Sequence, residues 1–284
     1  MSLTPTEPTL ILSDLHIGHR ASRIKDPEQL APVLRGSSSI IFNGDTVEMR
    51  HATDRPLGRK FAAELARICH QAGKKAFFVN GNHDPTVSHI NHLDLHQGAV
   101  LVTHGDILFL GVAPWSRAAK HYRTIHRQFL DNLGPEDFTD FEKRLLATKR
   151  TTIELQMIEP PLTDQRWPGL RLFIRQFWPP HRPLMIAKAW WETPGLAANL
   201  GRVFRPQARF ILLGHTHFPG AWKVDPRIVI NTGGFVPSIG GACAAIIDSK
   251  KIELRRVVSY KRQFVLGKRI AGYAIDPLRP TDGF

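Results

Sequence analysis

The chain has 284 residues, 42% of them hydrophobic, which is typical of a soluble globular protein with a sizeable core. No apolar stretch approaches the roughly 18 to 20 residues of a spanning helix, and residues 1–8 lack a signal-peptide pattern. The net charge of +13 favours contact with phosphate groups, whether in nucleic acid, anionic lipid or a phosphorylated metabolite. We expect a cytoplasmic protein whose Cys69 and Cys243 are free thiols.

Five short apolar runs predict buried strands, and polar residues follow directly after each run. The runs cover residues 9–12, 39–42, 75–79, 99–102 and 210–213. Because open α/β sheets place their sites in loops at the carboxyl ends of strands, we expect these polar residues to meet.

Other segments have clear but different patterns. Residues 59–72 predict a helix with Phe61, Leu65 and Ile68 on one stripe and Gly73 after its end. The strand-like runs 228–230, 242–247 and 252–258 indicate an antiparallel or mixed second sheet. We expect residues 260–284, basic and then rich in Pro and Gly, to lie over the surface.

Residues 115–209 separate the fourth predicted strand from the fifth and predict a helical insertion. Gly134-Pro135 and Thr193-Pro194 each have the pattern of a helix start, with apolar residues at helical spacing behind them. Five of the six tryptophans lie in this range, at positions 115, 167, 178, 190 and 191. We expect one domain over residues 1–284, with 115–209 inserted into it as a cap.

The polar residues after the strands are carboxylates, amides and imidazoles, the ligand types of hard to borderline divalent metals. They form five motifs: Asp14-Leu15-His16, Gly44-Asp45, Gly81-Asn82-His83-Asp84, His104-Gly105 and Gly214-His215-Thr216-His217. A carboxylate can bind two metals through its two oxygens, so Asp45 is the best candidate to bridge. Two such ions clamp a phosphoryl group and lower the pKa of a water that attacks phosphorus in line.

His83 is the natural acid to protonate the leaving oxygen, and Asp84 is expected to orient its ring. His83 and Asn82 are also candidates to contact the phosphate of the substrate. The catalytic pair predicted from the residues is therefore His83 and Asp84.

The ordered set of five motifs resembles the calcineurin-like metallophosphoesterases, over residues ~9 to 105 and ~209 to 247. The resemblance implies an α/β fold, a four-layer αββα sandwich of two mixed sheets. It also implies two divalent metal ions, manganese first, with iron, zinc or magnesium as alternatives. One ion would be held by Asp14, His16, Asp45 and His217, and the other by Asp45, Asn82, His104 and His215.

The substrate is less well determined than the reaction. Residues 11–16 and His104-Gly105-Asp106 resemble the UDP-2,3-diacylglucosamine pyrophosphatase branch, in which a helical insertion takes up acyl chains. That branch usually has Arg where this chain has His83. With His83, the motif is more similar to that of the wider phosphodiesterases and phosphatases of the family. A phosphodiester, pyrophosphate or phosphomonoester, with or without a lipid, stays open as the substrate.

Several alternatives remain beside this reading. The basic and aromatic insertion favours either a cap on an anionic membrane, at its inner face, or an ordinary packed subdomain. A nuclease or cyclic-nucleotide phosphodiesterase would have the same motifs, although no nucleic-acid-binding signature is present. A non-catalytic scaffold that binds membranes is a further alternative, and His89, His92 and His96 are either a zinc site or a solvated cluster.

Overall fold

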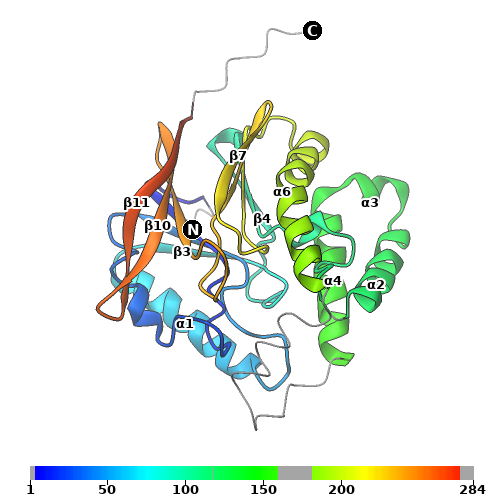
Figure 1. Ribbon diagram of the computed structural model, residues 1–284, viewed down its shortest axis with the longest axis horizontal. Helices are drawn as coiled ribbons and strands as arrows, with labels where there is room; N and C mark the ends of the chain where they lie inside the picture. The colour runs from blue at the N-terminus through cyan, green and yellow to red at the C-terminus, as the bar shows by residue number, and fades with distance from the viewer. Residues whose placement is uncertain (1–3, 117, 159–180, 276–284) are drawn as a thin grey trace.

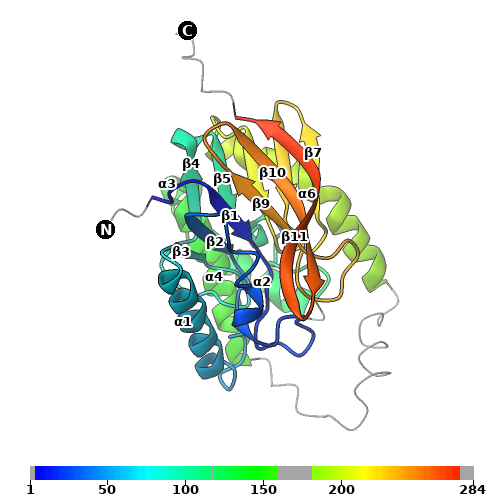
Figure 2. The same cartoon turned by 90° about the vertical axis from the view of Figure 1, so that its left-hand side faces the viewer.

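The computed structural model describes residues 4–116, 118–158 and 181–275. Two β-sheets pack face to face, and helices cover the outer face of each sheet (Figure 1; Figure 2). The predicted α/β fold, with two mixed sheets between layers of helices, is confirmed.

The first sheet has six strands and contains the first three predicted runs side by side. In spatial order the strands are β11 (Gln263–Ala274), β10 (Lys251–Tyr260), β9 (Cys243–Ile247), β1 (Thr9–Leu12), β2 (Ser39–Asn43) and β3 (Lys75–Val79). β1, β2 and β3 run parallel, so their carboxyl ends meet at one edge. β9, β10 and β11 are each antiparallel to the neighbouring strand.

The second sheet has five strands and contains the other two predicted runs. In spatial order the strands are β4 (His92–Leu95), β5 (Val100–Thr103), β6 (Phe210–Leu213), β8 (Arg227–Asn231) and β7 (Gly220–Val224). β5, β6 and β8 are parallel, and the outer strands β4 and β7 are antiparallel to their neighbours. The carboxyl ends of β5 and β6 therefore also lie together.

One expectation for the C-terminal part is wrong. Its strands do not form a sheet of their own, because β8 pairs with β6 while β9 and β10 extend the first sheet beside β1. Residues 263–274, expected only to lie over the surface, form the edge strand β11, which pairs along the whole of β10 and buries Phe264. Residues 276–284 lie outside the described part of the chain.

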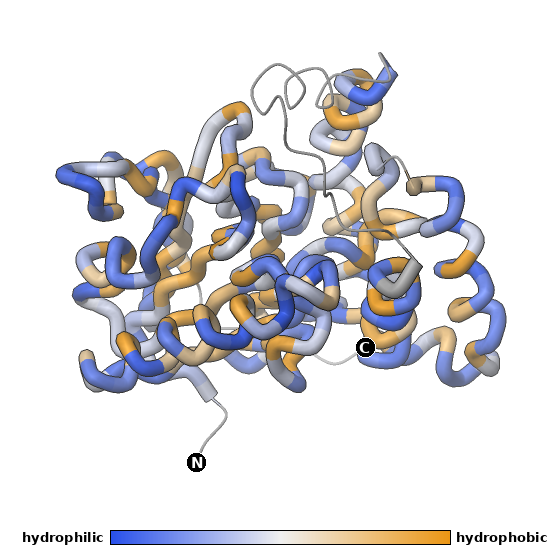
Figure 3. Tube along the Cα trace, turned by 90° about the horizontal axis from the view of Figure 1, so that it is seen from below, coloured by the Kyte–Doolittle hydropathy of each residue, from blue (hydrophilic) through white to orange (hydrophobic). Residues whose placement is uncertain are grey.

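Side-chain alternation along the strands divides the core into layers. Leu10 and Leu12 of β1 pack toward α1 (Arg55–Gln71), whereas Ile11 points between the sheets. In β6, Leu212 points between the sheets, whereas Leu213 faces the helices on the other side. Figure 3 shows hydrophobic stretches through the middle of the molecule and hydrophilic ones around much of its rim.

We call residues 115–209 the helical segment, and its described residues, 115–116, 118–158 and 181–209, supply the outer layer on the second sheet. The helices are α2 (Ala119–Asp131), α3 (Pro135–Thr139), α4 (Phe141–Ile158) and α6 (Arg182–Phe204). Phe141 and Leu145 of α4, together with Ala197 and Leu200 of α6, pack on β5, β6 and β8. Short 3₁₀ helices, η1 (Pro27–Leu30), η2 (His96–Gly98) and η3 (Asp106–Leu108), complete the described elements.

Helix starts within this segment differ from the expectation at one place. Thr193-Pro194 lies inside α6, which already begins at Arg182 with a proline in its first turn. Pro194 lacks an N–H group, and the Thr193 hydroxyl donates to the Ala189 carbonyl one turn earlier. Gly134-Pro135 does start a helix, the five-residue α3. Trp167 and Trp178 lie outside the described residues, and no described helix is long and apolar enough to cross a membrane.

Candidate metal centre

The backbone is left-handed at the residues that carry most of the expected ligands. Asp14, His16, Asp45, His215 and His217 have φ of 53°, 48°, 49°, 67° and 53°. This conformation costs a residue with a Cβ roughly 1–2 kcal/mol, so the surrounding contacts must hold it. The two loops brace each other, since the N–H groups of Asp14 and His16 donate to the carbonyls of Gly44 and Asp45 at 3.1 and 2.8 Å.

Glycines in the motifs allow this close approach of loops. A Cβ on Gly44, whose φ is +79°, would lie 2.4 Å from Nδ1 of His104. A Cβ on Gly214 would lie 2.2 Å from a carboxylate oxygen of Asp14. A larger residue at either position would displace an expected ligand.

Four side chains converge at one side of Asp45, and we call them the first ligand group: Asp14, His16, Asp45 and His217. Their potential ligand atoms all lie within 4.8 Å of one another. Nε2 of His217 is 3.1 Å from Oδ1 of Asp14, and Nε2 of His16 is 3.7 Å from Oδ2 of Asp45. The two Nε2 atoms are only 3.2 Å apart, a spacing typical of imidazoles directed at one point.

The second ligand group lies at the other oxygen of Asp45 and comprises Asp45, Asn82, His104 and His215. The ligand atoms of Asp45, His104 and His215 lie within 4.8 Å of one another. Nε2 of His104 is 3.4 Å from Oδ1 of Asp45 and 3.2 Å from the Asn82 side-chain oxygen. The structure thus brings all seven expected ligands together, with Asp45 common to both groups.

Both imidazoles of the second group are oriented by main-chain carbonyls. Nδ1 of His104 lies 3.0 Å from the Asn43 carbonyl, and Nε2 of His215 lies 2.9 Å from the Val112 carbonyl. A ring nitrogen that donates to a carbonyl leaves the other nitrogen available for a metal. His104 therefore offers Nε2, and His215 offers Nδ1.

The ring of His83 has a partner that the sequence reasoning missed. Its Nδ1 lies 2.9 Å from Oε2 of Glu48, so the contact expected from Asp84 is made by Glu48. Asp84 instead accepts hydrogen bonds from four backbone N–H groups at 2.7–3.2 Å, those of Asp45, Thr46, Val47 and Gly81. Asp84 thereby holds the loop that carries Asp45. For Glu48, the sequence gives no signal other than a carboxylate three residues after Asp45.

The electrostatics of the buried cluster suit metal binding at three of the expected ligands but not at His104. Burial alone would lower the pKa of His104, but the Asp45 carboxylate raises it to about 10, so an ion would have to displace a proton there. Burial, with His83 nearby, lowers the pKa of His16 to about 3, and burial with His104 lowers that of His215 to about 4. Burial alone would raise the pKa of Asp45, but the imidazoles of His104, His83 and His16 bring it well below its usual range. At neutral pH Asp45 is therefore ionised while His16 and His215 are neutral, as metal binding requires.

Other histidines of interest have ordinary structural partners. His92 contacts Asp94 and Glu142, and His96 contacts Glu7. Within the described ranges, no group able to hold a metal ion includes His89, His92 or His96.

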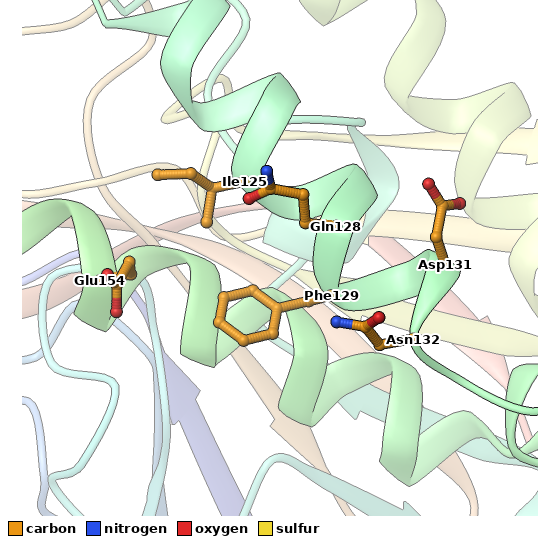
Figure 4. Close-up of a pocket in the computed structure, with 6 residues that line it drawn as sticks. All are labelled: Ile125, Gln128, Phe129, Asp131, Asn132 and Glu154. Atoms are coloured by element: carbon orange, nitrogen blue, oxygen red, sulfur yellow. The ribbon is translucent and has the colours of Figure 1, made fainter.

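A surface pocket of about 580 Å³ lies between α2 and α4, away from both ligand groups (Figure 4). It is lined by Ile125, Gln128, Phe129, Asp131, Asn132 and Glu154. None of the expected ligands lines it, so the pocket is separate from the candidate metal centre.

The family follows from a match over most of the chain. Residues 7–219 match the model of the calcineurin-like phosphoesterases. The chain belongs to this family. Phosphoesterases of this family are metal-dependent and act on phosphorylated substrates, which agrees with the clustered His and Asp residues described above.

Solved structures to which the chain is similar include vacuolar protein sorting 29 from Cryptosporidium parvum, 12% identical with a TM-score of 0.43 over 94% of this chain and 99% of that one. Another is YfcE, a phosphoesterase from E. coli, 16% identical with a TM-score of 0.41 over 94% and 99%. A predicted phosphoesterase from Streptococcus pneumoniae is 15% identical with a TM-score of 0.37 over 94% and 97%. No curated protein matches the chain.

Proposed function

We propose that this calcineurin-like phosphoesterase is a hydrolase with a dinuclear metal centre. The observation that carries the proposal is the position of Asp45 between the two ligand groups. Its Oδ2 lies 3.7 Å from Nε2 of His16, and its Oδ1 lies 3.4 Å from Nε2 of His104. One carboxylate is thus shared by two sets of ligands, as a bridging residue must be.

The donor set fits two divalent ions. Each group combines imidazole nitrogens with carboxylate or amide oxygens, a mixture that suits Mn²⁺, Fe²⁺ and Zn²⁺, and we propose Mn²⁺ as the working ion. The first group would hold one ion and the second group the other. Bound there, the ions supply Lewis-acid polarisation of a phosphoryl group and lower the pKa of water.

His83 is placed to donate a proton to the leaving oxygen. Burial alone would lower the pKa of His83, but the carboxylates of Glu48 and Asp45 raise it above its usual value. The protonated ring is therefore favoured, and the contact of Nδ1 with Glu48 leaves Nε2 for the substrate. We assign His83 as the general acid and Asp84 as the support of the Asp45 loop.

The substrate we propose is a phosphoester or pyrophosphate attached to a lipid. Support comes from one face of α6, where Leu184, Lys188 and Trp191 project into solvent; Trp191 is 88% exposed. Exposed apolar and basic side chains on one helix face favour an anionic lipid interface. By this proposal the chain is cytoplasmic and peripheral at the membrane. It also has one domain over residues 1–284, with residues 115–209 inserted as a cap.

The test is hydrolysis by the full chain with and without Mn²⁺. Purified protein is offered bis(p-nitrophenyl) phosphate, p-nitrophenyl phosphate and a nucleoside-diphosphate lipid, after removal of metal with a chelator and after its return. We expect turnover only with metal, and its loss in Asp45→Ala, because that variant removes a ligand from both groups. Undiminished turnover by metal-free protein or by Asp45→Ala would reject the dinuclear metal centre as the site of hydrolysis, and no turnover of any substrate with metal present would reject the hydrolase.

The lipid part of the proposal has its own test. We expect the protein to bind vesicles that contain anionic lipid and to dissociate as salt rises, because the attraction to the surface is electrostatic. Trp191→Ser should weaken this binding, whereas Phe138→Ser, which changes an exposed aromatic on α3, serves as the control. Absence of vesicle binding at low ionic strength would leave a hydrolase of a water-soluble substrate.

A further inference from the structure

The helical segment touches the second ligand group and its loops at several points. Val112, just before the segment, accepts from His215, and the Trp115 ring lies 5.2 Å from the His215 ring. From α4, Gln156 reaches Asn82 and Lys149 reaches Asp106. In the described residues, Trp190 contacts the loop of the first group, since its Nε1 donates to the Thr216 carbonyl and its ring stacks on Phe218 at 4.6 Å.

Gln156 acts on the loop that carries Asn82. Its side chain is buried, and its amide nitrogen donates to the Asn82 backbone carbonyl at 3.1 Å. This bond fixes the backbone of Asn82, a proposed ligand. The Asn82 side-chain oxygen lies 3.2 Å from Nε2 of His104. Without Gln156 that carbonyl loses its partner, and the loop is free to shift.

Lys149 acts on the segment that follows His104. Its ammonium lies 2.9 and 2.7 Å from the two carboxylate oxygens of Asp106, and both side chains are almost fully buried. Asp106 is the first residue of η3 and lies two positions after His104. A buried ion pair with this geometry fixes α4 against η3, because neither charge can be exposed without breaking the pair.

From these contacts the geometry assigns Gln156 and Lys149 as positioning residues that set the metal affinity of the second ligand group and leave the first unchanged. The assignment rests on the proposed dinuclear centre. By this assignment α4, which contributes no ligand, determines the affinity of the protein for one of the two ions. Residues that orient metal ligands from behind commonly change metal affinity by about 10- to 100-fold when replaced.

The experiment measures Mn²⁺ binding to the full chain by calorimetry. Gln156→Leu is compared in two backgrounds, His16→Ala, which leaves only the second group intact, and His104→Ala, which leaves only the first. We expect Gln156→Leu to weaken the remaining site at least about 10-fold in the His16→Ala background and to leave it unchanged in the His104→Ala background.

Matched controls come from the same helix. Glu154→Leu makes a similar change two residues from Gln156 at an exposed position (Figure 4), and we expect it to leave both sites unchanged. Because Lys149→Met alone would leave a buried unpaired carboxylate, the pair is tested as Lys149→Met with Asp106→Asn, and Lys149→Arg is expected to retain the affinity.

The outcomes separate the positioning role from the proposed function. A wild-type chain that binds fewer than two ions overturns the dinuclear centre, and the positioning role with it. Two ions in the wild type, with equal weakening in both backgrounds or none in either, overturn the positioning role alone. A weaker site in Glu154→Leu would also overturn it, because α4 would then act through general stability.

Discussion

The two ligand groups share Asp45 but differ in what holds their other side chains. In the second group, both imidazoles lie against main-chain carbonyls, and α4 supports the neighbouring loops. Among the described residues, neither His16 nor His217 of the first group has such a carbonyl partner. Nε2 of His217 instead contacts other members of the group, Oδ1 of Asp14 at 3.1 Å and Nε2 of His16 at 3.2 Å. The rings of the second group are therefore oriented by the main chain, whereas those of the first group contact other side chains of the same group.

By the positioning role proposed above, this difference lets a helical layer act on a loop site without supplying a ligand. The first group is built from loops after β1, β2 and β6. The left-handed backbone of these loops is stabilised by hydrogen bonds between the loops themselves. The second also depends on contacts with residues 106–156, far away in the chain. Preorganised ligands bind more tightly because less order has to be created on binding.

Removal of one ligand from each group gives the largest expected effect. We expect wild-type protein to bind two Mn²⁺ ions with the tighter site in the second group, since its rings are already oriented. His16→Ala should lose the weaker site and His104→Ala the tighter one, each by about 100-fold or more. Calorimetry and metal analysis of the dialysed proteins measure both.

Two observations would break this comparison. Equal affinities of the two wild-type sites would show that the carbonyl contacts of His104 and His215 do not matter for binding. Loss of both ions in either variant would show that the sites bind only as a pair. His70→Ala, in the last turn of α1 and in neither group, is the control.

A smaller effect is expected when the partner of His83 is changed. Glu48→Gln keeps the size of the side chain but removes the charge that favours protonated His83, so we expect kcat for an aryl phosphodiester to fall about 10-fold. The metal content should stay at the wild-type value. Glu48, His83 and His16 lie close enough to hold an ion themselves, so loss of metal in Glu48→Gln would make Glu48 a ligand instead.

The smallest effect concerns how the helical segment is attached to the second sheet. His92 of β4 contacts Glu142 of α4 and Asp94, at 3.1 and 3.5 Å. Burial alone would lower the pKa of His92, but these two carboxylates raise it. Protonated His92 therefore stabilises the fold below pH about 6.5, and this contribution is lost as pH rises through its raised folded pKa.

Thermal unfolding at several pH values measures this attachment. We expect His92→Gln to destabilise the chain by about 1 kcal/mol at pH 6 and less at pH 9. We also expect Mn²⁺ affinity to stay unchanged, because Gln156 and Lys149 remain in place. Destabilisation that is equal at both pH values would mean that His92 acts through its neutral ring. Weaker Mn²⁺ binding by His92→Gln would mean that the affinity of the second group depends on the attachment of the whole helical layer and not on Gln156 and Lys149 alone.

Local pattern was enough to predict the strands and the residues at their ends. The runs before Asp14, Asp45, His104 and His215 are short, mostly apolar and buried at every position, so the strand and the polar residue after it are encoded side by side. Proximity of the loops then followed from parallel pairing, which places the carboxyl ends of β1 and β2 together. The prolines were less informative, since Pro194 lies within a helix that its tertiary packing maintains.

Contacts between distant segments were decided only by the folded chain. Glu48 faces His83 from 35 positions away, and Gln156 reaches Asn82 from 74 positions away, and no periodicity along the chain encodes such distances. The same holds for β11. Its basic sequence predicted only a surface segment, and its strand conformation depends on pairing with β10. Residue types and their local spacing therefore determined which side chains are available for metal. Packing of the helical layer on the second sheet, and packing of the two sheets on each other, decided which of these side chains are held in place. Those interactions depend on surfaces that exist only after folding.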